Sequence, residues 1–386
     1  MKLRGSHILI TLALSVPFFT FTGCTQGVQG IFAELEAEVA IRTNNLGNGN
    51  MQAMTRATVD GTDSYVVLKG IAMFHRDVDG GQWQRLAPPP EFGMAQFLTT
   101  VTVGGEDHLY AVFGGEGGAI SFTLRRREDG SWSDELFTAS GFTRITGLAA
   151  EGDKLYVSAT NDSSSTGTTH LFESDRSSPD PAAPITGSGI SFPGGGGSTE
   201  RDLQKVLTTT TAGGKTWIVG RQALFELDGG ALLTAVTTPD GVRDVELLDN
   251  DILVAVTTGG GVFTAAAADA SNWTSRAQDE KRFTSVTQVR DGLIVVGSEA
   301  SFSATSRGRG FMDGTVTSTG GSVTITLSNP RGNYRSTQMQ VSSLNGFFVD
   351  EPGPNARLFV LTVAGDRGLY RADNYNISDA VSWEME

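Results

Sequence analysis

Short runs of β-branched and apolar residues alternate with clusters of Asp, Asn and Gly along most of this chain. The stretch from Val242 to Trp273 shows the unit, with predicted strands at Arg243–Leu248, Ile252–Thr257, Val262–Ala265 and Asn272–Thr274. Turn-forming residues separate these strands, which predicts a tight antiparallel meander. One such sheet cannot bury its own faces, so copies of it must pack beside it.

The chain supplies these copies, each marked by an aromatic residue in its predicted third strand. The markers are Phe74, Phe122, Phe172, Phe225, Phe263, Phe302 and Tyr370. A recurrence of about 40–50 residues with several strands in each unit is typical of propeller blades. We therefore predict an all-β fold, a seven-bladed β-propeller over residues 51–386, with six or eight blades as alternatives.

Two segments interrupt the regular spacing. The last interval between markers is longer and predicts an insertion at Thr315–Asn333, as an extra hairpin or an extended outer strand. The segment Ser177–Ser198 is rich in Pro and Gly and predicts a loop between the third and fourth blades. It is not predicted to be a domain linker, because the same strand pattern resumes on both sides of it.

Trp residues mark several predicted outer strands, at Trp83, Trp132, Trp273 and Trp383. A large amphipathic ring in an outer strand can seal the gap to the neighbouring blade while its N–H stays near water. Asp77–Trp83 and Asp129–Trp132 resemble the Asp-box hairpins of sialidases and related propellers. Asp boxes are structural turns, so the resemblance supports the fold and implies nothing about catalysis.

Residues 1–23 have the pattern of a secretion signal, with Lys2 and Arg4 before the apolar stretch Ile8–Phe21. The stretch ends in Gly23-Cys24, which resembles the bacterial lipobox. The resemblance implies that Cys24 is lipidated, that acyl chains hold the protein on a membrane, and that the bacterial outer membrane is its destination. Residues 24–50 would then be a lipidated tether. The alternative is an ordinary leader followed by an incidental Cys.

Composition narrows the functional classes. A net charge of −14 argues against binding to a nucleic-acid backbone. A single Cys rules out a disulfide framework or a thiolate metal cluster within one chain, and only four His residues are present. The chain contains no Gly-x-Ser-x-Gly, phosphate-loop or His-Glu-x-x-His motif. We expect no cofactor, no metal site and a monomer.

Arginines recur at the start of several predicted first strands, a few residues before the central apolar position. They are Arg144, Arg201, Arg243, Arg282 and Arg335. The first strand of a propeller blade lines the central channel, so these guanidinium groups would gather at one mouth and bind a carboxylate, sulfate or phosphate. The alternative is that each Arg pairs with a neighbouring acid, such as Asp202 or Asp244.

Two functional classes fit these features. The first is a lipid-anchored envelope protein whose propeller binds a protein, glycan or other anionic ligand without catalysis, and a general resemblance to propeller lipoproteins of outer-membrane assembly or adhesion agrees with it. The second is a sialidase- or lyase-like enzyme acting on anionic glycans, which needs Arg, Tyr and carboxylates converging at the channel. Packing inside second strands explains Tyr65, Tyr110 and Tyr156. No residue requires catalysis, so we favour the binding protein.

Overall fold

The computed structural model describes most of the chain from residue 49 onward. The described residues are 46, 49–115, 122–161, 167–177, 183–193, 202–211, 214–229, 232–279, 282–298, 310–319, 322–329, 344–363, 368–375, 381 and 383–386. The predicted signal peptide and Cys24 lie outside them. Within the described residues, no helix has the length and apolar character needed to cross a membrane.

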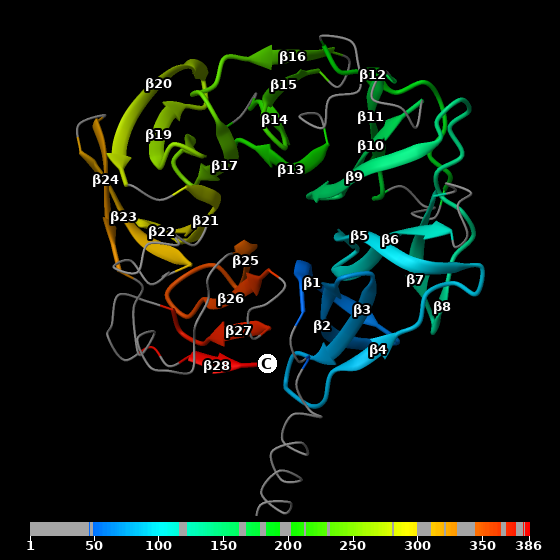
Figure 1. Ribbon diagram of the computed structural model, residues 1–386. Helices are drawn as coiled ribbons and strands as arrows, with labels where there is room; N and C mark the ends of the chain where they lie inside the picture. The colour runs from blue at the N-terminus through cyan, green and yellow to red at the C-terminus, as the bar shows by residue number, and fades with distance from the viewer. Residues whose placement is uncertain are drawn as a thin grey trace, which may run out of the picture.

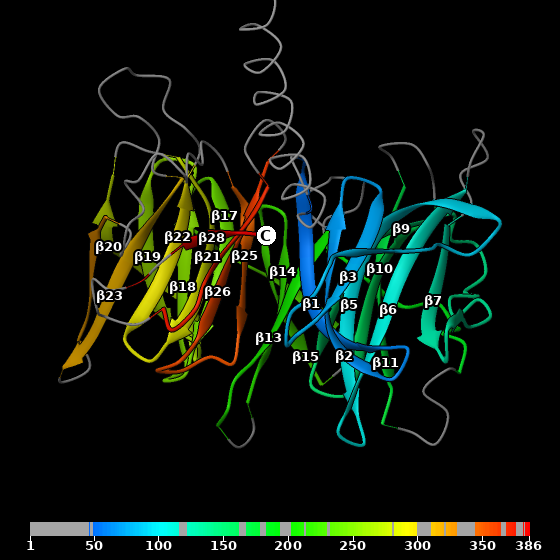
Figure 2. The same ribbon diagram turned by 90° about the horizontal axis from the view of Figure 1, so that it is seen from below.

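The strands form upright sheets arranged in a ring around a central axis (Figures 1 and 2). One sheet has eight strands: β1 (Met51–Val59), β2 (Thr62–Lys69), β3 (Ala72–Asp77), β4 (Gln84–Leu86), β5 (Phe92–Val103), β6 (Glu106–Gly115), β7 (Phe122–Glu128) and β8 (Ser131–Trp132). We call it the double sheet, because β1–β4 and β5–β8 are successive antiparallel meanders within it.

Five further sheets have four strands each and follow the chain around the ring. The first contains β9 (Arg144–Glu151), β10 (Lys154–Thr160), β11 (Thr169–Asp175) and β12 (Ile190–Ser191). The second contains β13 (Leu203–Thr208), β14 (Thr216–Gly220), β15 (Leu224–Asp228) and β16 (Leu232–Val236). The third contains β17 (Val242–Leu248), β18 (Ile252–Thr257), β19 (Gly261–Ala266) and β20 (Asp269–Gln278). The last two contain β21 (Phe283–Arg290), β22 (Leu293–Ser298), β23 (Phe311–Thr319), β24 (Ser322–Ser328), and β25 (Leu344–Asp350), β26 (Arg357–Thr362), β27 (Leu369–Ala372), β28 (Trp383–Met385).

The predicted all-β propeller is confirmed, but the prediction of seven separate blades is not. Five four-stranded sheets stand alone, and the strands predicted as the first two blades share one hydrogen-bonded sheet. The cause is a parallel bridge between Thr58 of β1 and His108 of β6. A hydroxyl hydrogen bond from Thr55 to Thr100, at 2.8 Å, adds a side-chain link between the same two meanders.

Turn chemistry explains why each sheet is a tight meander. In the β17–β20 sheet, Asp251 has a φ of 56° and Gly260 a φ of 79°, both in the left-handed region. Asp and Gly adopt this region more readily than other residues, which lets β17, β18 and β19 reverse direction within short turns. Predicted strands 243–248, 252–257 and 262–265 match the observed ones to within a residue at each end.

The two irregular segments differ from their predictions in part. Thr315–Asn333 contains the second half of β23 and all of β24, so it supplies an extended outer strand and not an extra hairpin. Part of the long interval arises because β23 begins at Phe311, later than the predicted marker Phe302, which lies outside the described residues. Ser177–Ser198 is not only a loop, since β12 within it pairs with His170 and Leu171 of β11.

The hydrophobic core lies between neighbouring sheets, and outer-strand Trp residues close its edges. Trp132 donates its indole N–H to the backbone oxygen of Ala87 at 2.8 Å, and Trp273 donates to Thr237 at 2.9 Å. In both cases the acceptor belongs to the segment after the preceding outer strand, β4 or β16. These contacts confirm the predicted sealing role of these two Trp residues.

Charged and polar side chains hold the ring closed where the last sheet meets the first. Asp350, at the end of β25, is 5% exposed. It accepts a hydrogen bond of 2.6 Å from the hydroxyl of Tyr65. It also forms an ion pair with Arg56, with 3.0 Å between Arg56 Nη1 and Asp350 Oδ1. Arg357 also donates to the Tyr65 hydroxyl. Because β28 completes the last sheet from its own segment of chain, side-chain contacts and one backbone hydrogen bond, from Leu46 N–H to the Glu386 oxygen at 3.2 Å, close the ring at this junction.

Candidate functional site

The innermost strands of the sheets are arranged around a common axis (Figure 1), and a central channel lies between them. They are β1, β5, β9, β13, β17, β21 and β25. The channel holds a cavity of about 890 Å³, and its lining residues come from all of these strands. It is larger than the two other cavities, which are described below. A concave site of this size with convergent polar groups is the first place to look for ligand binding.

Each innermost strand contains a β-bulge close to its start. The bulges leave these residues without a register partner on the neighbouring strand: Gln52, Gln96, Thr146, Gln204, Arg243, Thr284 and Asn345, with further shifts at Gly93 in β5 and Val289 in β21. A bulge interrupts the alternation of side chains, so it can re-aim a residue toward the channel. All of these residues except Arg243, Gly93 and Val289 line the cavity.

We call Gln52, Gln96, Thr146, Gln204, Thr284 and Asn345 the bulge ring. The residue after the bulge often lines the cavity as well, as Phe97 does after Gln96 and Lys205 does after Gln204. Two successive side chains therefore face the channel where a regular strand would present one. On β1, β5, β13 and β21 the bulge residue and the residue after it both line the cavity.

The wall formed by β1, β5 and β25 is neutral. Asn345 donates both amide hydrogens, to Asn50 Oδ1 at 2.6 Å and to the backbone oxygen of Met51 at 2.7 Å, which fixes its side chain. Phe97 and Phe347 are half-buried and line the cavity together with Gln52, Gln96 and Asn345. This wall therefore combines amide groups with apolar surface.

The wall formed by β9, β13 and β17 is charged. Lys205 Nζ lies 2.9 Å from Asp244 Oδ2 and 3.1 Å from Glu246 Oε2, and it donates to the backbone oxygen of Val286 at 3.0 Å. Asp244 also accepts the backbone N–H of Val286 at 2.8 Å and that of Val245 at 2.9 Å. Lys205 thus links β13, β17 and β21, and all three of its ammonium hydrogens have an acceptor.

In this cluster, burial and the neighbouring charges shift the pKa values of Lys205 and Glu246 in opposite directions. Burial disfavours the charged form of Lys205, but Asp244 and Glu246 outweigh it and raise the pKa of Lys205 above its ordinary value. Burial also raises the pKa of Glu246, more than the nearby Lys205 lowers it. Burial raises the pKa of Glu151, a backbone hydrogen bond from Thr208 partly offsets the rise, and the charge of Glu246 adds to it.

Arginines and one acid meet at the face where the innermost strands begin. Arg144 opens β9, Asp202 precedes β13, and Arg221 follows β14, whose end pairs with the start of β13. All three line the cavity, and both arginines are exposed. Burial raises the pKa of Asp202, while the charges of Arg144 and Arg221 partly offset the rise. We call these three residues the rim cluster.

The structure brings only part of the predicted arginine set to the channel. Arg144 lines the cavity, whereas Arg243 and Arg282 are not among the lining residues. Arg201, Arg335 and Cys24 lie outside the described residues. The partner of Arg144 in the rim cluster is Arg221, which the sequence reasoning missed because it lies in a turn between strands. The complete arginine rim stays a prediction.

The bulge ring was also missed, although the sequence carries a signal for it. A polar residue stands near the start of each innermost strand, just before the apolar positions that mark the strand centre, as in Gln52 and Gln204. Sequence alone does not show that the strand slips by one residue there. The register of both partner strands is needed to recognise a bulge.

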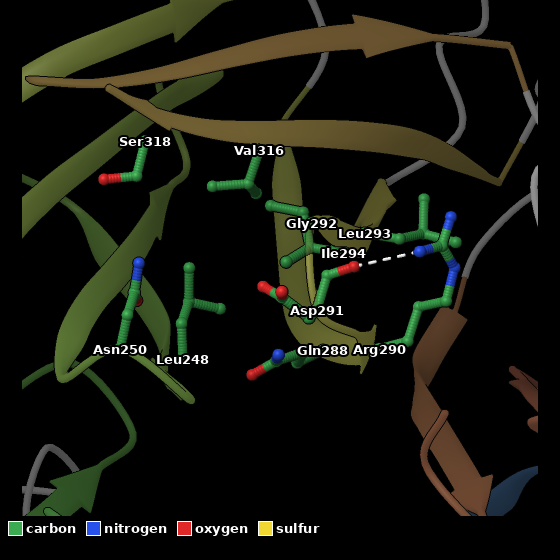
Figure 3. A pocket seen from close by; sticks show the side chains of 10 residues that line it. All are labelled: Leu248, Asn250, Gln288, Arg290, Asp291, Gly292, Leu293, Ile294, Val316 and Ser318. Atoms are coloured by element: carbon green, nitrogen blue, oxygen red, sulfur yellow. Dashed lines mark hydrogen bonds between the residues drawn. The ribbon is translucent and has the colours of Figure 1, made fainter. Parts of the chain in front are cut away.

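The opposite face holds two smaller hollows. One, of about 40 Å³, is lined by residues such as Leu248, Asn250 and Ile294 (Figure 3). In Figure 3 Arg290 extends away from Leu248 and donates to the backbone oxygen of Asp291 at 3.0 Å. A space of this size suits water molecules and not a larger ligand. The second hollow, of about 540 Å³, includes Glu246, which also lines the channel cavity.

No protein-family model matches the chain, and no curated protein matches it. Solved structures do resemble it. An ancestral GH74 enzyme matches with a TM-score of 0.63 and 12% identity, over 88% of this chain and 47% of that one. YCF48 bound to D1 peptide matches with a TM-score of 0.56 and 11% identity, over 87% and 94%.

An extracellular domain assigned to a hybrid two-component system of B. thetaiotaomicron matches with a TM-score of 0.51 and 11% identity, over 83% of this chain. The present chain spans only 38% of the length of that domain. At these identities the likenesses show the propeller fold alone. The neighbours differ in function, and a shared fold does not transfer function.

Proposed function

We propose that this chain is a non-catalytic ligand-binding protein of the bacterial envelope, anchored through lipid on Cys24, and that its ligand binds at the bulge ring. One observation carries the binding site: bulges on β1, β5, β13 and β25 bring amide side chains to the lining of the same cavity. Bulges are often found next to functional sites, where they re-aim side chains.

We also count β1–β4 and β5–β8 as two units of the ring, because each is a complete meander.

The charged residues of the channel support binding more than catalysis. Lys205 already has three acceptors, and Asp244 accepts three hydrogen bonds from Lys205 and the backbone. These groups brace neighbouring sheets. The glycan-enzyme alternative calls for Tyr at the channel, but Tyr65, Tyr110 and Tyr156 are at most 2% exposed. In the described part of the chain, no Tyr lines the cavity.

Binding at the bulge ring can be tested with purified protein beginning at residue 25. Arrays of immobilised peptides and oligosaccharides provide the probes, and calorimetry provides the affinity of each hit. We expect the double variant Gln52→Ala/Gln204→Ala to bind its ligand at least tenfold more weakly, because both side chains are exposed at the cavity and each offers a donor and an acceptor.

The matched control is Gln82→Ala/Gln84→Ala, two exposed glutamines at and before the outer strand β4. It should bind within twofold of the unchanged protein. If the ring variant and the control bind every hit equally well, the site is elsewhere. Mass spectrometry of the recovered ligand separates the functional classes, because conversion of the ligand to a product would establish the enzyme alternative.

The lipid anchor is tested in a bacterial host by metabolic labelling with an alkyne fatty acid. We expect the label on the full-length chain, with the protein in the membrane fraction. The variant Cys24→Ser should carry no label and should leave the membrane fraction, because the only thiol of the chain has been removed. An unlabelled wild-type protein would contradict the anchor and leave the proposed binding site untouched.

A further inference from the structure

The bulge ring offers hydrogen-bond donors and acceptors together. Each Gln amide carries a carbonyl acceptor and an NH₂ donor, and Asn345, whose amide hydrogens are both donated to Asn50 and Met51, offers its carbonyl, whereas a site built from Arg or Lys alone offers donors only. The amides of Gln52, Gln96 and Asn345 come from adjacent innermost strands, β1, β5 and β25, and that of Gln204 from β13. A ligand that suits this ring presents alternating donors and acceptors, as the N–H and C=O groups of an extended peptide do.

Apolar residues line the cavity on both walls, and its two aromatic lining residues, Phe97 and Phe347, lie on β5 and β25. Phe97 and Phe347 are half-buried in the lining, and Met54 of β1, which also lines the cavity, has 8% of its surface exposed. Phe347 is held edge-on against Phe311, with ring centroids 5.7 Å apart. This rigid apolar surface can take a hydrophobic side chain, which a purely polar ligand would leave unused.

The rim cluster gives the opposite wall a local positive excess. Arg144 and Arg221 carry two positive charges against the single carboxylate of Asp202, in a chain whose net charge is −14. Deeper in the channel, Glu151 and Glu246 disfavour a negative ligand group. A ligand carboxylate is therefore favoured at the rim and disfavoured further in.

We propose that the channel binds an extended peptide segment, with its main chain against the bulge ring, an apolar side chain against Phe97 and Phe347, and a carboxylate at Arg144 and Arg221. The inference deepens the proposed function and rests on it. A neutral oligosaccharide matches the amides but leaves the rim charges without a partner. A small anion matches the rim and leaves the apolar wall empty. An acidic oligosaccharide also carries a carboxylate for the rim, but the apolar side chains of Phe97 and Phe347 favour a peptide with a hydrophobic side chain, and binding of the oligosaccharide instead is an outcome of the test.

The carboxylate has two sources, a free C-terminus or an Asp or Glu side chain, and the experiment distinguishes them. The probes are fluorescent decapeptide pools with one fixed Leu in three forms: free C-terminus without acidic residues, amidated C-terminus with one Glu, and amidated C-terminus without acidic residues. Fluorescence anisotropy measures binding to the protein beginning at residue 25. We expect binding of the first or the second pool at least tenfold tighter than binding of the third.

The double variant Arg144→Gln/Arg221→Gln should remove this preference for a carboxylate, because it removes both cations of the rim cluster. Both side chains are exposed, so the fold should be retained, and a thermal unfolding curve checks this. Arg85→Gln is the control, since Arg85 is exposed on the outer strand β4. It should retain the preference.

Three outcomes decide against the inference. Equal binding of all three pools, or a carboxylate preference that survives in Arg144→Gln/Arg221→Gln, overturns the assigned ligand chemistry. Binding of oligosaccharides but not peptides, lost in Gln52→Ala/Gln204→Ala, overturns the peptide and keeps the proposed function. Failure of both kinds of probe to bind in a ring-dependent way overturns both.

Discussion

Lys205→Met is expected to lower the free energy of unfolding by about 3 kcal/mol, near the lower end of the cost of breaking a buried ion pair. The substitution keeps most of the side-chain length but removes the link from β13 to Asp244, Glu246 and the backbone of Val286. The side chains of Asp244 and Glu246 are 7% and 17% exposed and that of Lys205 is 30% exposed, so the cluster is mostly buried and the cost is placed at the lower end of that range. Urea unfolding followed by circular dichroism measures the change.

The matched control is Lys154→Met. Lys154 pairs with Glu173 on the neighbouring strand β11, and its side chain is 44% exposed, so solvent screens the pair. A surface pair of this kind contributes about 0–1 kcal/mol. Equal losses in the two variants would show that Lys205 does not brace the sheets.

The effect of Lys205→Met should also depend on pH. Without the ammonium, the pKa of Glu246 in the folded protein, already raised by burial, rises further. An acid whose pKa is higher in the folded than in the unfolded state costs stability as pH rises above its unfolded value, about 4.3 for Glu. The difference between variant and wild type should therefore be smallest near pH 4 and grow toward neutral pH.

Trp217→Ala is expected to cost about 3–5 kcal/mol, the usual range for removing a buried Trp side chain. Trp217 is fully buried in β14 and packs in a hydrophobic cluster with Val245 and Leu253 of the next sheet. Truncation leaves a cavity at the junction between two sheets, where neither backbone can collapse without disturbing the ring. The same urea experiment measures it.

Trp217→Phe provides the comparison. It keeps most of the apolar ring and removes an indole N–H that has no hydrogen-bond partner among the described residues. A loss below about 1.5 kcal/mol is expected for such a conservative hydrophobic change. If Trp217→Ala were as mild as Trp217→Phe, the contact between these two sheets would carry little of the stability.

Local patterns predicted the repeating unit well. Alternating apolar residues and Asp or Gly turns are properties of neighbouring residues, so the strands β17, β18 and β19 were predicted nearly to the residue. The outer strands were predicted less well. Strand β12 has only two residues, Ile190 and Ser191, and its pairing with β11 depends on the fold and not on a local apolar pattern.

The candidate site was predicted less well, because it combines residues that are far apart in the sequence. Arg144 was found because it opens a strand, but Arg221 comes from a turn between strands and joins it only through the pairing of β14 with β13. Bulge residues such as Gln52 and Asn345 look like ordinary polar residues of a strand. Their common orientation toward one cavity follows from register shifts between paired strands, which a single strand's sequence does not show.

The sequence by itself determined that the chain makes repeated four-stranded meanders, because hydrophobic alternation and turn residues act over a few neighbouring positions. It also determined that Trp132 and Trp273 would seal the outer edges. Only the tertiary structure decided that the first two meanders share one sheet, and that Lys205 braces three strands. It also decided which polar side chains reach the channel, because these outcomes depend on contacts between segments far apart in the chain.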